Sequence, residues 1–148
     1  MIKLKNPSQS KIPEYLFLFY FYGATYITIE VFFRGYSHWT MFLLGAFCGI
    51  MIGLINNVLP WKTPLILQAV LGGVIVTLNE FIFGYILNIK LGLGIWDYSN
   101  MWGNVLGQIC PLFSICWCAL SLVAIVIDDY IKYWFFNEEE PKYKWFWF

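Results

Sequence analysis

Two glutamates stand inside long apolar stretches of this chain, where an ionised side chain is costly. Placing such a group in the hydrocarbon of a membrane costs at least about 2.5 kcal/mol on insertion scales. Glu30 has Arg34 four residues later, which is the spacing of neighbours on one helix face. Glu80 has no Lys or Arg within two helical turns. Glu30 is therefore best explained as an ion pair near a membrane surface, and Glu80 needs another explanation.

Two explanations of Glu80 are open. A carboxyl group without a nearby cation favours its neutral form in hydrocarbon, so Glu80 can serve to exchange a proton or to hold a ligand. Alternatively, Glu80 makes structural hydrogen bonds to amide side chains, for which Asn79, Asn104 and Gln108 are the candidates. In the first case we expect Glu80, Asn104 and Gln108 to form a polar centre for a substrate or ion.

The single histidine, His38, lies in a short connection just after Arg34. Zinc takes three or four nitrogen, sulfur or oxygen ligands, and no others recur at ligand spacing nearby, so we expect no metal here. The simpler interpretation of His38 is a polar contact at the membrane surface. The alternative is a group that titrates near neutral pH and works with Glu30.

Residues 89–103 form the most unusual connection of the sequence, rich in glycine and aromatic residues. Trp and Tyr favour the headgroup zone of a bilayer. One interpretation is an interfacial loop in which Asp97 and Asn100 cap the helix that follows. The other is a re-entrant lid that projects Asp97, Tyr98 and Asn104 over the opening between the helices.

The sequence lacks the motifs of several classes of function. No GxxxxGK[ST] motif follows Gly92-x-Gly94, so any ATP-driven process needs a separate ATPase subunit. The four cysteines have neither redox nor zinc spacing, and no nucleophile elbow supports a serine hydrolase. Nine basic and nine acidic residues leave no net charge, which argues against nucleic acid as a partner. We therefore expect no catalytic residue, no cofactor and no metal.

The elements that position these residues follow from composition. Of 148 residues 60% are hydrophobic and 12% are charged, which is typical of a protein whose partner is the lipid bilayer. A bilayer core is crossed by about 20 apolar residues in a helix. Four runs qualify, and they predict one all-α membrane domain over 1–148. The predicted spans are 15–33, 39–59, 65–87 and 105–127, followed by a cytoplasmic interfacial tail at 128–148.

Small and polar residues mark the faces on which these helices touch. Helices in a bilayer associate through close backbone packing, so Gly45, Gly49 and Gly53 at spacings of four predict a contact face on the second span. That face serves either packing within the chain or a homo-oligomer, and both are open. The fourth span is expected to turn Asn104 and Gln108 inward on its own polar face.

The connection and the span after it also carry a resemblance. Trp96-Asp97-Tyr98-Ser99 followed by Asn104-x-x-Gly107-Gln108-Ile109-Cys110 resembles the signature of the CmpB-like, ABC-transporter type IV membrane proteins of bacteria. Further polar positions of that family have similar residues here, namely Glu30, Glu80 and the stretch from Arg34 to Trp39. The resemblance spans about residues 15–135. It implies a protein of the bacterial cytoplasmic membrane with a role in transport.

The leading hypothesis is a small multi-pass permease or transporter subunit, acting as a homo-oligomer or with membrane partner subunits. Glu80, Asn104 and Gln108 would form its polar centre. The residues expected at the outer mouth are Glu30, Arg34, His38 and Asp97. Two alternatives from other classes are a holin-like or scaffold membrane protein without transport, and an intramembrane enzyme that modifies lipid.

Lys and Arg divide unevenly between the two sides of the predicted membrane. Seven of the nine fall on the side of both termini and of the 60–64 turn, and Arg34 and Lys90 fall on the other. The seven are Lys3, Lys5, Lys11, Lys62, Lys132, Lys142 and Lys144. Because positive residues concentrate in cytoplasmic loops, both termini are predicted to be cytoplasmic.

Reporter fusions test this orientation. A reporter that is active only in the periplasm should give signal when it is fused after Ile95 and none when it is fused after Phe148. The reverse pattern would contradict the orientation and place His38 and Asp97 in the cytoplasm.

Overall fold

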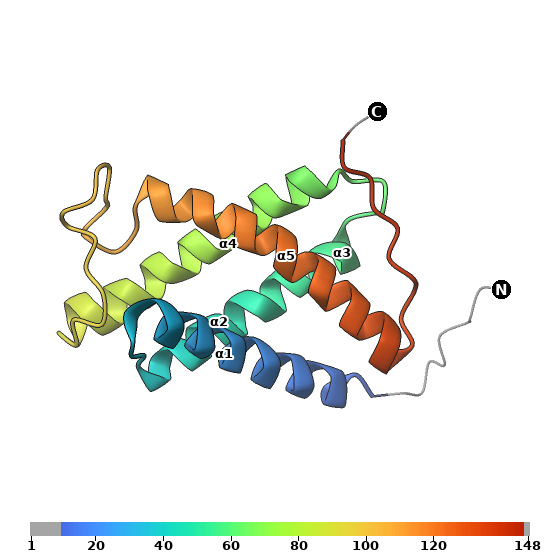
Figure 1. Ribbon diagram of the computed structural model, residues 1–148, viewed down its shortest axis with the longest axis horizontal. Coiled ribbons are helices and arrows are strands. Elements are labelled where there is room, and N and C mark those ends of the chain that lie inside the picture. The colour runs from blue at the N-terminus through green and yellow to red at the C-terminus, as the bar shows by residue number, and fades with distance from the viewer. Residues whose placement is uncertain (1–9, 147–148) are drawn as a thin grey trace.

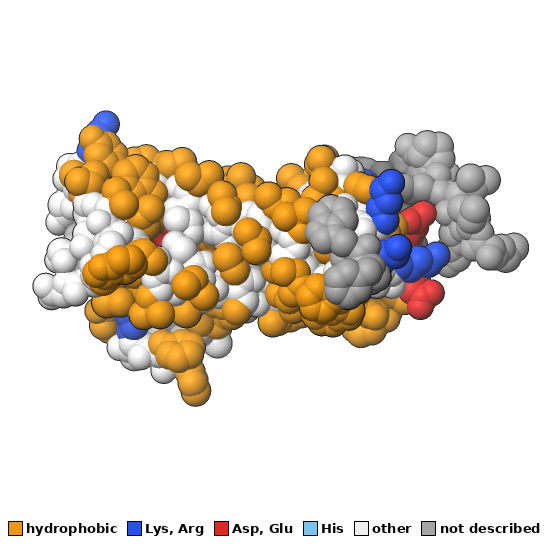
Figure 2. Space-filling view, turned by 90° about the horizontal axis from the view of Figure 1, so that it is seen from above, with side chains coloured by type: hydrophobic (Ala, Val, Ile, Leu, Met, Phe, Trp, Pro, Cys, Tyr) orange, Lys and Arg blue, Asp and Glu red, His pale blue; other side chains and the backbone are white. Residues whose placement is uncertain are grey.

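The computed structural model describes residues 10–146, which fold into helices without a strand. Four helices in this range are long and apolar enough to cross a membrane, and they confirm the predicted four-span architecture. These candidate spans are Ile12–Arg34, Trp39–Val58, Leu65–Lys90 and Pro111–Phe136. Large exposed hydrophobic side chains such as Leu78 and Ile115 cover the helices. Hydrophobic side chains are spread along the length of the visible face, and Lys and Arg side chains lie toward its two ends (Figure 2).

The bundle consists of two helix pairs. Helix α1 (Ile12–Arg34) packs along α2 (Trp39–Gly53), and α4 (Leu65–Gly84) crosses α5 (Pro111–Phe136) (Figure 1). Helix α1 ends because Gly35 adopts a left-handed conformation (φ 78°), which satisfies a carbonyl of the last turn. A turn at Leu54 separates α2 from the short α3 (Ile55–Val58), and η1 (Tyr85–Lys90) continues α4 as a π-helix.

The predicted glycine face of α2 lies against other helices of the same chain. A Cβ atom at Gly45 would overlap Tyr26, and one at Gly49 would overlap the Tyr22 ring, both on α1. A Cβ atom at Gly53 would stand 2.6 Å from Oδ1 of Asp128 on α5. These three glycines therefore serve packing within the chain, and homo-oligomer formation stays a prediction.

The fourth span differs from its predicted limits of 105–127, because α5 begins at Pro111 and runs to Phe136. Proline suits the first turn of a helix, and Leu106 and Gly107 before it have positive φ, which an α-helix cannot contain. Asn104 and Gln108 consequently lie in the preceding connection and not on a helix face. Residues 128–136, expected in an interfacial tail, form the last turns of α5.

Helix α1 begins and α5 ends at the same end of the bundle (Figure 1). A cluster of polar side chains joins α1, α2 and α5 toward that end. Asp128, which is fully buried, accepts a hydrogen bond from the Tyr22 hydroxyl (2.6 Å) and pairs with Lys132 (2.6 Å). Lys132 also donates to the carbonyl of Gly53 (2.9 Å), just before the turn that ends α2. Lys132 is thus a buried partner of α2 and not a surface cation. Of the other basic residues counted for the predicted orientation, Lys3 and Lys5 lie outside the described residues.

The segment after α5 covers this polar cluster. The Tyr143 hydroxyl donates to Oδ2 of Asp129 (2.8 Å), which also accepts from Asn56 of α3. The backbone N–H of Leu65, at the start of α4, donates to the carbonyl of Lys144 (2.6 Å). The segment therefore joins α3, α4 and α5 at one end of the bundle.

Replacing Gly49 by Leu should disrupt the packing of α1 on α2. Overpacking a close contact costs about 1–3 kcal/mol in well-packed interiors, and here the added atoms meet the Tyr22 ring. We expect a lower melting temperature in detergent. Phe47→Leu, at an exposed position of α2, is the control and should change it little. Equal melting temperatures for the two variants would show that Gly49 does not form this contact.

Candidate functional site

The connection between η1 and α5 is a folded unit, which we call the 91–110 cap. Its Trp96 indole donates to the carbonyl of Gln108 (3.0 Å), and the N–H of Tyr98 donates to the carbonyl of Gly107 (2.7 Å). Ile95 and Trp96 are buried, each with 8% of its surface exposed. The cap lies at the end of the bundle opposite α3 (Figure 1).

Amide side chains hold the cap in place. Asn88 of η1 donates to Oε1 of Gln108 (2.8 Å) and accepts from the N–H of Ile95 (2.7 Å). Asn104 donates to the carbonyl of Met101 (2.9 Å) and accepts from the N–H of Gly107 (2.9 Å). Asn104 and Gln108, expected in a polar centre with Glu80, thus make their hydrogen bonds within the cap and to Asn88.

Glu80 lies on α4 and is buried against α5 and the cap, with 3% of its surface exposed. The Tyr98 hydroxyl donates to its Oε1 (2.8 Å), and the Trp117 indole donates to its Oε2 (2.9 Å). Among residues 10–146, no Lys, Arg or His forms a salt bridge with Glu80. The predicted burial and hydrogen bonding of Glu80 are therefore present, but its partners are two aromatic donors where amides were expected.

Tyr98 is fixed from two directions, because its ring also stacks on Phe113 of α5 with centroids 4.9 Å apart. Burial, followed by the charge of nearby Glu80, raises the pKa of the Tyr98 hydroxyl well above its ordinary value. The hydroxyl therefore keeps its proton at physiological pH and stays a donor to Glu80. The cap places this donor on the carboxyl group of Glu80.

Glu30 and Arg34 form a second group that touches the cap. Arg34 pairs with Glu30 (2.7 Å) as their spacing predicts, and the Ser37 hydroxyl donates to the other oxygen of Glu30 (2.5 Å). A second nitrogen of Arg34 donates to the carbonyl of Ile95 (3.0 Å). Arg34 therefore connects the end of α1 to the cap.

His38 and Asp97 each serve a local backbone turn. His38 is the N-cap of α2, with Nδ1 2.8 Å from the Thr40 hydroxyl. Asp97 is exposed and accepts from the N–H of Ser99 (2.8 Å), and this hydrogen bond lowers the pKa of its carboxyl group. Asp97 thus stabilises a turn inside the cap, and α5, which it was expected to cap, begins at Pro111.

Sequence reasoning missed Trp117 and the cluster around Asp128. Trp117 is one of many aromatic residues in an apolar run, so no pattern marks it as a donor. Asp128 and Lys132 carried a usable signal, because an acid and a base four residues apart directly follow a predicted span.

Residues 15–147 match the family described as "Putative ABC-transporter type IV". This chain belongs to that family. No curated protein and no solved structure matches the chain. The family match, together with the four apolar helices, indicates a multi-pass membrane protein of transporter type.

Glu80→Leu should destabilise the protein, because it leaves the Tyr98 hydroxyl and the Trp117 N–H without an acceptor. An unpaired buried donor costs about 1–3 kcal/mol. Glu80→Gln should unfold close to wild type, since its carbonyl can accept from Trp117 while its amide donates to the Tyr98 oxygen. Thermal unfolding in detergent, followed by size-exclusion chromatography, measures both. Equal stability of the Leu and Gln variants would argue against these hydrogen bonds.

Proposed function

We propose that this protein is a small permease, or the membrane-spanning subunit of a transporter, in the bacterial cytoplasmic membrane, and that Glu80 is its polar centre. The observation that carries this proposal is the environment of Glu80. It is a buried carboxyl group held by Tyr98 and Trp117, two donors that are themselves uncharged. Such a group can exchange a proton or bind a cation, and carboxyl groups inside membrane proteins mark ion pathways and proton relays.

The cap supplies a means of coupling that event to access. Tyr98 belongs to the cap and Trp117 belongs to α5, so moving the cap withdraws one of the two donors to Glu80. The cap follows η1, and π-helical segments often occur at functional sites. Gly92 and Gly94 next to it have positive φ, at 65° and 57°. We propose that the cap closes the site on Glu80 and that the link from Arg34 to Ile95 holds it closed.

The orientation and the assembly belong to the same proposal. With both termini cytoplasmic, the cap and the Glu30 pair form the outer mouth of the site. The protein acts as a homo-oligomer or with membrane partner subunits. If ATP drives it, a separate ATPase supplies the nucleotide-binding loop that the sequence lacks.

Proton flux into liposomes tests the role of Glu80. Purified protein is reconstituted with a trapped pH-sensitive dye, and a potassium gradient with valinomycin imposes a membrane potential. Wild type should acidify the lumen at least about tenfold faster than Glu80→Gln, because an amide cannot exchange a proton.

Glu140→Gln is the matched control, since it removes an exposed carboxyl group in the segment after α5. It should behave as wild type. Flux from wild type no greater than from protein-free liposomes would contradict a proton-conducting site. Equal flux from wild type and Glu80→Gln would instead favour a holin-like pore without a fixed carboxyl group.

A further inference from the structure

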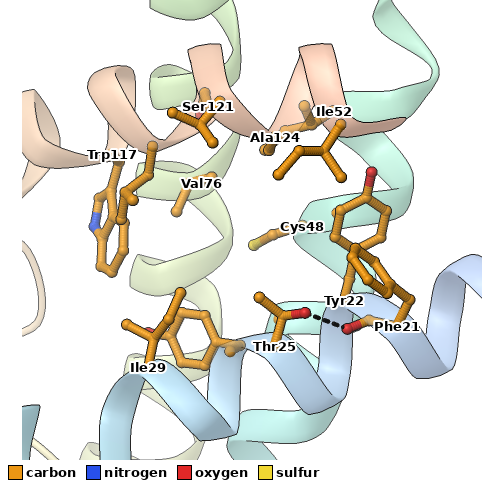
Figure 3. Close-up of a pocket in the computed structure, with 16 residues that line it drawn as sticks. Phe21, Tyr22, Thr25, Ile29, Cys48, Ile52, Val76, Trp117, Ser121 and Ala124 are labelled. Carbon is orange, nitrogen blue, oxygen red and sulfur yellow. Dashed lines mark hydrogen bonds between the residues drawn. The ribbon is translucent and has the colours of Figure 1, made fainter. Parts of the chain in front are cut away.

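A cavity of about 160 Å³ lies between α1 and α5, with α2 and α4 as its floor. Figure 3 shows Trp117 and Ala124 on α5, Tyr22 and Ile29 on α1, and Cys48 on α2 around this space. The atoms that line it are almost all carbon and sulfur. It is separate from Glu80, which does not line it.

The cavity opens toward the bilayer. Helix α1 packs mainly on α2, and α5 packs mainly on α4, so little contact closes the space between α1 and α5. Three residues of its α5 wall, Leu120, Val123 and Ile127, are also exposed on the outer surface, by 40–50%. The cavity is therefore continuous with the apolar surface that faces lipid.

Water does not suit this cavity, because a buried water needs two to four polar partners. Ser121 lines the cavity, but its hydroxyl is buried and lies toward α4. It stands 2.8 Å from where a Cβ atom of Gly72 would be. A cavity that is apolar and open to hydrocarbon takes up hydrocarbon.

We infer that this cavity is a binding site for one acyl chain of a bilayer phospholipid. A dry cavity of about 150 Å³ holds one benzene-sized molecule, so this one takes roughly six carbons of a chain whose remainder stays in the bilayer. A helix of a second copy, about 10 Å across with its side chains, is too thick to enter. The acyl chain contacts Trp117, Tyr22 and Cys48, which line the cavity. This binding does not require that the protein transports anything.

Photo-crosslinking distinguishes a chain in the cavity from lipid on the outer surface. The protein is reconstituted into phosphatidylcholine vesicles whose acyl chains carry a diazirine near their middle, irradiated and mapped by peptide mass spectrometry. Surface lipid reaches Ile115, which is 69% exposed, but not Cys48, which is 7% exposed on the cavity floor. We expect label at both residues. Label at Ile115 without label at Cys48 would overturn the proposal.

A cavity-filling variant gives the matched comparison. Ala124→Leu fills the space and should lower labelling of Cys48 by about fivefold or more, while labelling of Ile115 is unchanged. Ala119→Leu makes the same change at an exposed position of α5 and should leave labelling of Cys48 unchanged. If Ala124→Leu does not fold, Thr25→Leu fills the cavity from α1 and should give the same loss. Equal labelling of Cys48 in the filling and control variants would overturn the proposal.

Discussion

Polar side chains inside a bilayer find no water, so each must meet its hydrogen-bonding partner within the protein. This constraint explains where the helices of this protein are joined. At one end, Glu80 of α4 gathers donors from α5 and from the 91–110 cap. At the other, Asp128 of α5 gathers Tyr22 and Lys132. Between the two ends the contacts are apolar, apart from bonds such as that from Thr77 to Ser114.

Aromatic residues connect the two polar groups to the apolar cavity between them. The Trp117 ring lines the cavity while its N–H holds Glu80, and the Tyr22 ring lines it while its hydroxyl holds Asp128. A molecule in the cavity therefore touches a partner of each carboxyl group without touching either carboxylate.

The sequence predicted what depends on local periodicity and missed what depends on the path of irregular backbone. Apolar length identified four spans, and glycine spacing identified the face of α2 that packs on α1. The partners of Glu80 could not be found in this way, because Tyr98 reaches it through a cap shaped by positive φ at Leu106 and Gly107. Helical periodicity continued through Asn104 and Gln108 predicted a helix face where the backbone in fact turns.

The hydrogen bond from Leu65 to Lys144 has a consequence for the order of biogenesis. Leu65 begins α4, and its N–H is one of the donors that a helix cannot satisfy by itself. Its acceptor, the carbonyl of Lys144, is synthesised after the whole of α4. During synthesis this end of α4 must therefore be served by water at the membrane surface, and a late-made segment then displaces that water. Closure of this end of the bundle therefore cannot precede the synthesis of Lys144.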